Sequence, residues 1–462
     1  MHKEPLKVCM ITPHFPPDFG WYGPGRDAME LAEELYQRGY QVEVIACAEK
    51  HVAETVQDGL KVIRTDWRSH GSNNSLVANS LPQARVLMNL NLSSWQAFLK
   101  ASETSEFDIV DVAEFSAESL VASIMSDCPV VARVYDNPPA FLSRELDLIG
   151  DSGFRFEKLI SSTLRSLSAN SATSVTTIGQ PKFNTENGKG EQIYRSNYSL
   201  NTADFSPEGP LAIDTKGRPS LLIHTSIESE KYKNLVSEIV TAVKKQIPDL
   251  WLTIVAHDIY SESSESEMKA ALAQSGIECD MVINHMMSRL LMPGLWRNSV
   301  CGLVLDWKSL APYAVLEPLS CGKPIVIENN CSTLDFLSSN EFLHQPADFT
   351  VGAVAAKLVD LLKDEQLRTR LSTEARKYIL ANHCRKSNAD QLVKNYENAI
   401  EKFKASRRKE KIERMQNLIS QGRSITKGLD QWLYDLLFVR SFRFRVSHWL
   451  KKFRNRETAG SK

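Results

Sequence analysis

The sequence has no long apolar stretch, no closely paired cysteines and almost no net charge. No run reaches 18 apolar residues, so no membrane-spanning helix is expected. The eight cysteines include no C-x-x-C pair, which predicts buried free thiols in a reducing compartment. The N-terminal apolar run is too short for a signal peptide and prolines follow at once, so we expect a cytoplasmic protein. With 42% apolar and 24% charged residues, the composition excludes a disordered, collagen-like or disulfide-scaffold chain.

The net charge of -1 conceals an uneven distribution along the chain. Residues 401–462 contain 17 Lys and Arg against 6 Asp and Glu, which leaves the first 400 residues acidic. An acidic body with a basic tail indicates a partner for the tail, such as an anionic membrane or an acidic protein.

Short runs rich in Val and Ile alternate with amphipathic helical patterns, which is typical of parallel strands buried on both faces. The expected strands are 6–12, 40–48, 60–65, 107–113, 128–135, 172–178 and 191–196, then 220–226, 250–257, 280–285, 301–307 and 323–329. We therefore predict an α/β fold with two doubly wound Rossmann-like domains and a cleft between them.

The Pro-, Gly- and Asn-rich stretch 197–220 separates the two series of strands. It divides the chain into an N-terminal domain, 1–200, and a second domain, 201–385. A closing helix, 386–405, and a basic amphipathic tail, 406–462, complete the predicted organisation.

One carboxylate, Glu317, interrupts the apolar helical segment that leads into the strand PIVIEN. A carboxylate at the mouth of a cleft can accept two hydrogen bonds from a ribose diol. The alternative interpretation is an acid that complements the helix dipole.

Lys231 and Lys233 follow a strand and precede a helix. A lysine beside free helix N–H groups forms an anion site suited to a diphosphate, whereas a solvated surface lysine is the plainer alternative. Upstream, Gly20, Gly23 and Gly25 let the backbone approach a ligand, although their spacing is not G-x-G-x-x-G and a plain loop fits equally well.

In this order, the three segments resemble the retaining glycosyltransferases of family four, which have the two-domain GT-B fold. LAEELYQRGYQV resembles the family's first helix, and SLAPYAVLEPLSCGKPIV (309–326) resembles its central pattern EGFGxxxLExMACGxPVV. Residues 358–400 are similar to its closing helices, so the resemblance covers roughly residues 6–403.

The resemblance implies that 1–200 is the acceptor-side domain and 201–385 the nucleotide-sugar-binding domain. It also implies roles for individual residues. Glu317 matches the second glutamate of the E-x7-E motif, which holds the donor ribose, and Lys231 matches the lysine that neutralises the donor diphosphate. Gly23 and Gly25 match the glycine loop that faces donor phosphate and acceptor. The residues that would flank the nucleotide are Leu316, Pro318 and Leu319.

Three positions depart from the family pattern. Ser309 replaces the first glutamate, Ser226 replaces the arginine of the R-x4-K pair, and Tyr135 replaces a histidine that contacts the donor sugar. We keep Ser309 and Ser226 as candidate donor-binding residues and Tyr135 as a candidate catalytic residue. The cations that could replace the missing arginine are Arg133, Arg26 and Lys233.

The function expected from the resemblance is transfer of a sugar from a UDP- or GDP-linked donor to a glycan or lipid-linked acceptor. The configuration would be retained, and such enzymes serve surface polysaccharide or lipopolysaccharide synthesis. The sequence has no D-x-D motif, so we expect no metal and no cofactor apart from the donor, and no nucleic-acid partner. The altered positions keep open a binding or assembly subunit that has lost catalysis, and an epimerase on the same fold is a third alternative.

The tail interleaves aromatic and basic side chains, a pattern that suits an anionic bilayer interface. Packing of its apolar side chains on the protein body or on a second subunit is the alternative. The predicted membrane contacts are Trp432, Arg440, Arg443, Arg445, Trp449, Lys451 and Lys452.

Overall fold

The computed structural model describes a large part of the first 406 residues. The described residues are 5–16, 23–47, 53–66, 82–114, 117–135, 164, 167–179, 193–225, 230–256, 266, 269–270, 273–274, 279–284, 290–305, 312–328, 337 and 342–406. The chain divides into two compact units, Met1–Phe403 and Lys404–Lys462. The predicted tail contacts from Trp432 to Lys452 lie outside the described residues.

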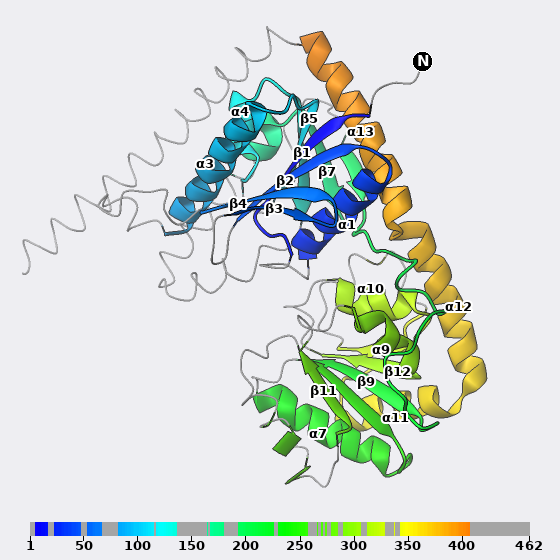
Figure 1. Ribbon diagram of the computed structural model, residues 1–462. Coiled ribbons are helices and arrows are strands. Elements are labelled where there is room, and N and C mark those ends of the chain that lie inside the picture. Colours follow the sequence, from blue (N-terminus) through cyan, green and yellow to red (C-terminus); the bar gives the residue numbers. More distant parts are fainter. Residues whose placement is uncertain are drawn as a thin grey trace, which may run out of the picture. The chain divides into compact units, whose positions relative to one another are not determined.

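The first sheet has eight strands in the order β3-β4-β2-β1-β5-β6-β7-β8, all parallel except β3, which pairs antiparallel with β4 (Figure 1). The strands are β1 (Lys7–Thr12), β2 (Gln41–Cys47), β3 (Ala53–Gln57), β4 (Leu60–Thr65), β5 (Ile109–Glu114), β6 (Val130–Tyr135), β7 (Ser174–Ile178) and β8 (Ile193–Ser196). The seven strands that the sequence predicts here are present, and β3 is an addition.

Helices cover both faces of this sheet. Side chains of α1 (Gly23–Gln37) and α13 (Arg385–Ser406) form one core cluster with β1, β2 and β4. Side chains of α3 (Pro82–Ser102) and α4 (Leu120–Met125) form a second cluster with β1 and β5 on the other face. The parallel strands are therefore enclosed between two helical layers, as their continuous apolar runs predict.

The second sheet has five parallel strands in the order β11-β10-β9-β12-β13. They are β9 (Ser220–Thr225), β10 (Trp251–Ala256), β11 (Met281–Asn284), β12 (Cys301–Val304) and β13 (Ile325–Ile327). Helices α7 (Glu230–Lys244) and α11 (Val351–Lys363) share a core cluster with this sheet. A separate cluster contains side chains of α9 (Met292–Asn298), α10 (Tyr313–Ser320) and α12 (Glu365–Asn382). This doubly wound arrangement is the α/β architecture that the sequence predicts.

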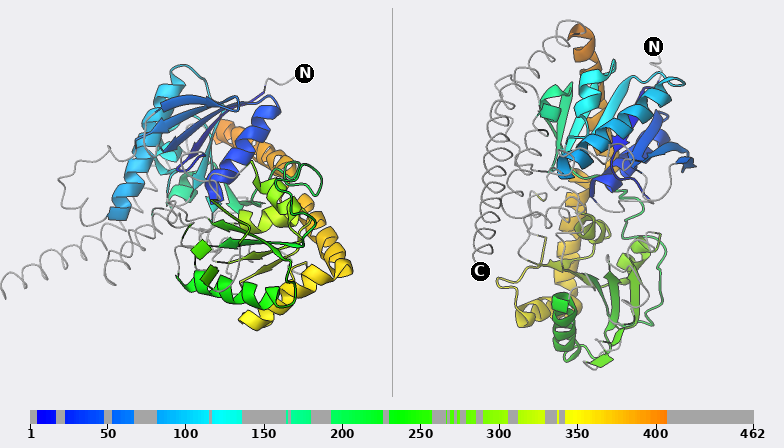
Figure 2. Two further views of the ribbon diagram at one scale, coloured as in Figure 1. Left: turned by 60° about the horizontal axis from the view of Figure 1, so that its bottom comes forward. Right: turned by 90° about the vertical axis from the view of Figure 1, so that its left-hand side faces the viewer.

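Helices α12 and α13 follow one another at the end of the first unit, as Figure 2 shows. Helix α12 contacts α10 of the second sheet region, whereas α13 packs against α1 of the first. Arg385, at the start of α13, forms ion pairs of 3.1–3.2 Å with three acids of α1, namely Glu30, Glu33 and Glu34. The closing segment thus connects the two sheet regions through both packing and charge.

The seven cysteines among the described residues are free. In the same part of the chain, no helix is both long and apolar enough to cross a membrane.

Candidate functional site

The order of the second sheet identifies where a ligand is expected. β9 and β12 are neighbours, and the connection after β9 leads to β10 on one side whereas the connection after β12 leads to β13 on the other. In doubly wound sheets, ligands bind in the crevice outside the carboxyl ends of the strands at this switch point. Residues just after β9, β12 and β13 are therefore the first candidates for a binding site.

A polar cluster occupies this edge, formed by Lys231, Tyr232 and Glu328. The Lys231 Nζ lies 3.6 Å from the Glu328 Oε1 and 4.7 Å from the centroid of the Tyr232 ring. The Tyr232 hydroxyl donates to the Glu328 Oε2 at 3.1 Å. We call these three residues the Lys231 cluster.

Access differs within the Lys231 cluster. The Lys231 side chain is 66% exposed, whereas that of Glu328 is 10% exposed. Lys231 stands in the first turn of α7, where backbone N–H groups lack helical partners, so its ammonium group and the helix end can meet an anion together. Lys233, by contrast, is buried. Of the two lysines that the sequence singles out, Lys231 is the one accessible to a diphosphate.

Glu317 has a different environment. It lies in α10, whose residues are all buried, and it is 0% exposed. Its Oε1 accepts a hydrogen bond from the Arg26 Nη1 of α1, and its Oε2 accepts one from the Trp296 Nε1 at 3.4 Å. Both carboxylate oxygens are therefore engaged, and neither is presented to a ribose as the sequence interpretation requires.

Arg26 is held from several sides. Its guanidinium carbon lies 4.3 Å from the centroid of the Tyr313 ring, and its Nε is 3.5 Å from the Glu30 Oε1. Burial alone would lower the pKa of Arg26, but Glu317 and Glu30 outweigh it and raise that pKa above its ordinary value. Arg26 is thus paired within the protein with Glu317 and Glu30.

Tyr135 and Arg133 form a second buried network at the end of β6. The Tyr135 hydroxyl donates to the Asp27 Oδ2 at 2.5 Å and accepts from the Arg133 Nη1. Arg133 also pairs with Asp27 at 3.0 Å and with Asp111 at 2.7 Å. Burial raises the pKa of Tyr135 well above its ordinary value, so the phenol is neutral. The structure engages both groups internally rather than at an open surface.

The donor-binding residues predicted after residue 200 divide into two groups. Leu316, Leu319 and Pro318 are buried in α10, and both leucines belong to the core cluster with Trp296. Ser226 and Ser309 lie outside the described residues.

The two predicted loop glycines begin helix α1. Gly23 has φ +60°, a conformation that glycine adopts without strain. A Cβ on Gly25 would lie 2.8 Å from the His14 Cβ, so this glycine permits α1 to approach the segment after β1. This close approach gives Gly25 a packing role.

The structure adds an acidic residue that the sequence interpretation did not select. Glu114 ends β5, beside β1 at the switch point of the first sheet. Its Oε2 accepts from the Ser119 backbone N–H at 2.8 Å and from the Ser168 hydroxyl at 3.0 Å. Burial and the nearby Glu118 raise the pKa of Glu114 to about 7. Glu114 and Glu328 share a recognisable signal, because each stands at the end of a buried apolar run.

The described residues contain no group of three or more His, Cys, Asp or Glu side chains arranged to hold a metal ion.

Comparisons with known proteins agree with this geometry. Residues 213–378 match the family model of glycosyl transferases group 1, a range that contains the Lys231 cluster and Glu317. No curated protein sequence matches the chain.

Several solved structures share its fold. A glycosyltransferase from Rickettsia africae aligns with a TM-score of 0.58 and 12% identity, over 86% of this chain and 99% of that one. HepE from Anabaena, in complex with UDP and glucose, gives a TM-score of 0.55 and 13% identity, over 84% of this chain and 99% of that one. WaaG, a glycosyltransferase involved in lipopolysaccharide biosynthesis, gives a TM-score of 0.55 and 14% identity, over 83% of this chain and 98% of that one. The chain therefore has the GT-B fold of these glycosyltransferases, and its second sheet region carries a stretch that matches the group 1 glycosyl transferase family.

Proposed function

We propose that this protein transfers a sugar from a UDP- or GDP-linked donor to a glycan or lipid-linked acceptor. The observation that carries the proposal is the Lys231 cluster, which combines an exposed ammonium group, a helix end and a carboxylate at the switch point of the second sheet. Its position within the group 1 match, 213–378, supports the same assignment. The complex of HepE with UDP and glucose shows that this fold accommodates such ligands in another protein.

The chemistry follows from the charge that develops during transfer. As the bond from the sugar to the diphosphate breaks, negative charge grows on the leaving phosphate, and a preorganised cation stabilises that charge. Lys231 with the first turn of α7 would supply this stabilisation, while the Glu328 carboxylate would hold the lysine in place.

Two finer features of the reaction rest on the sequence. Retention of configuration, with the leaving phosphate assisting deprotonation of the acceptor, follows from the resemblance to family four. Independence from metal follows from the lack of a D-x-D motif. A role in surface polysaccharide or lipopolysaccharide synthesis is part of the same proposal, and the likeness to WaaG supports it.

A second candidate function is binding of a nucleotide sugar without turnover. The observation that favours it is the engagement of Glu317 by Arg26 and Trp296, and of Tyr135 by Asp27 and Arg133. A donor would reach these groups only by breaking buried, charge-assisted hydrogen bonds, which costs several kcal/mol in general.

The test separates the two candidates in one series of experiments. Calorimetric titration with UDP and GDP sugars measures binding, and release of the nucleoside diphosphate in the presence of lipid-extract acceptors measures transfer. Release of the diphosphate that depends on the acceptor establishes the transferase. Binding without release establishes the second candidate, and failure of every donor to bind refutes both.

We further propose a cytoplasmic protein that associates peripherally with the inner face of the membrane through residues 406–462. The basis is the aromatic and basic pattern of the tail, which suits an anionic interface and a lipid-linked acceptor. Flotation on vesicles that contain anionic lipid should recover the full chain but not a chain ending at Phe403. Equal flotation of the two proteins would refute this proposal.

A further inference from the structure

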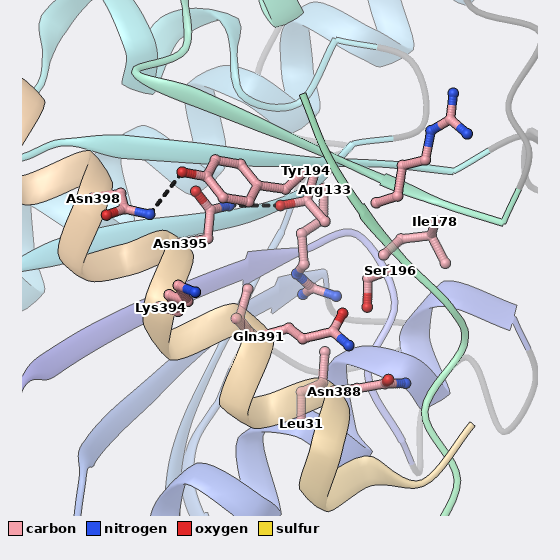
Figure 3. A pocket seen from close by; sticks show the side chains of 13 residues that line it. Leu31, Arg133, Ile178, Tyr194, Ser196, Asn388, Gln391, Lys394, Asn395 and Asn398 are labelled. Atoms are coloured by element: carbon pink, nitrogen blue, oxygen red, sulfur yellow. Dashed lines mark hydrogen bonds between the residues drawn. The ribbon is translucent and has the colours of Figure 1, made fainter. Parts of the chain in front are cut away.

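A cavity of about 280 Å³ lies between helix α13 and the part of the first sheet formed by β6, β7 and β8 (Figure 3). Liquid water of that volume amounts to about nine molecules, so the space exceeds a packing defect. Buried Arg133 and Asn395 line its inner part, whereas the exposed residues Gln391 and Lys394 line it from α13. The group 1 match, 213–378, does not include these residues.

One charged group in this cavity has an unused donor. The Arg133 side chain is 1% exposed, and its Nε and Nη1 pair with Asp111 and Asp27. Its Nη2 has no hydrogen-bond partner among the residues that the structure describes. A buried donor without an acceptor has lost its hydrogen bonds to water without replacement, and the cost is greater when the group is charged, so a ligand oxygen placed here would gain binding energy.

The other polar groups around this donor both donate and accept hydrogen bonds. Figure 3 shows the side chains of Gln391 and Ser196 converging on the guanidinium group of Arg133. An amide and a hydroxyl can each exchange hydrogen bonds with ligand hydroxyl groups. Because side chains alternate along β8, Arg195 is directed to the opposite face from Ser196.

The charges at the cavity largely offset one another, which favours a neutral ligand. Arg133, Arg195 and Lys394 line the cavity and carry three positive charges, and the two aspartates paired with Arg133 carry two negative charges. A doubly charged phosphate would find little net attraction there, whereas a ligand rich in hydroxyl groups would find donors and acceptors in close proximity.

We propose that this cavity is a binding site for a single sugar residue or a polyol of similar size. The Arg133 Nη2 donates to a ligand oxygen, and Gln391 and Ser196 exchange hydrogen bonds with ligand hydroxyl groups. Arg133 also donates to the Tyr135 hydroxyl, so an occupant of the cavity would contact the network that holds Tyr135. The site is independent of the proposed transfer reaction.

The test is ligand-observed saturation-transfer NMR on the full chain. D-glucose, D-galactose and N-acetyl-D-glucosamine serve as separate probes, and inorganic phosphate, followed by its ³¹P line width, serves as the anionic probe. We expect saturation transfer to at least one sugar and no broadening of the phosphate line.

Variants at the cavity test whether the saturation-transfer signal comes from a sugar bound there. Gln391→Trp fills the space from an exposed helix position, and Gln391→Leu removes its hydrogen bonds with less bulk. Lys386→Trp is the matched control, because Lys386 is exposed on the same helix and does not line the cavity. We expect Gln391→Trp to abolish the signal, Gln391→Leu to weaken sugar affinity about tenfold, or about 1.4 kcal/mol, and Lys386→Trp to leave it unchanged.

Three results would overturn the proposal: no saturation transfer to any sugar, binding of phosphate alone, or a sugar signal that persists in Gln391→Trp. A saturation-transfer signal that UDP abolishes and that persists in Gln391→Trp would come from a sugar bound at the proposed donor site instead. The saturation-transfer signal does not depend on transferase activity. Failure of the cavity proposal can therefore be distinguished from failure of the proposed transfer reaction.

Discussion

The buried ion pair between Arg26 and Glu317 makes a quantitative prediction for Glu317→Gln. The substitution keeps the shape of the side chain but leaves Arg26 buried with only Glu30, whose Oε1 lies 3.5 Å from the Arg26 Nε. Removing one partner of a buried pair costs about 3–5 kcal/mol, and the remaining acid places this case near the lower limit. The amide oxygen can still accept from Trp296, so that hydrogen bond adds little to the loss. We expect a loss of about 3 kcal/mol in the free energy of unfolding.

Urea denaturation, analysed for the first unfolding transition, measures this loss. Asp390→Asn is the control, because it removes an ion pair with Arg38 in which the aspartate is 70% exposed, and it should cost less than about 1 kcal/mol. The double change Arg26→Met with Glu317→Leu should recover most of the stability, since Glu30 retains Arg385 as its partner. A loss for Glu317→Gln as small as that of the control would refute the buried pair.

Two further substitutions test the first sheet region. Burial raises the pKa of Glu114 to about 7 from an ordinary value of 4.5, so its contribution to stability is present below pH 4.5 and is lost as the pH rises to 7. The unchanged protein should lose on the order of 3 kcal/mol of its free energy of unfolding at pH 8 and none at pH 4, and Glu114→Gln should lack this loss. Urea denaturation across that pH range measures the difference, and a difference between the two proteins that does not vary with pH would contradict the assignment. Gly25→Ala should lower stability by about 1–3 kcal/mol, because its Cβ would lie 2.8 Å from the His14 Cβ. A thermal midpoint equal to that of the unchanged protein would show that the close approach is easily relieved.

The strands illustrate what the sequence predicts well. β1 and β9 are apolar runs buried almost throughout, and both stand within a residue of their expected bounds. β3 was missed because it is a five-residue antiparallel edge strand, AETVQ, with largely exposed side chains. Such a strand depends on its neighbour β4 rather than on an apolar pattern of its own.

The site was harder to predict because its groups are defined by partners that are distant in the chain. The sequence singles out Glu317, but its partner Arg26 stands 291 positions earlier, and the fold alone brings them together. Tyr135 likewise meets Asp27, 108 positions away. Lys231 was foreseeable because its location depends only on a strand end and the following helix. Its contact with Glu328, across the sheet edge, required the strand order.

The most direct test of the central claim is calorimetric titration of UDP and GDP into Lys231→Gln and Lys245→Gln. Lys245 is an exposed lysine just after α7, at the opposite end of the same helix, and so provides the same change of charge away from the switch point. Because a charge-assisted hydrogen bond contributes about 1.5–3 kcal/mol and Lys231 is largely solvated, we expect about tenfold weaker binding for Lys231→Gln. We expect unchanged binding for Lys245→Gln. Equal affinity of the two variants for the nucleotide that binds would contradict a diphosphate site at the Lys231 cluster.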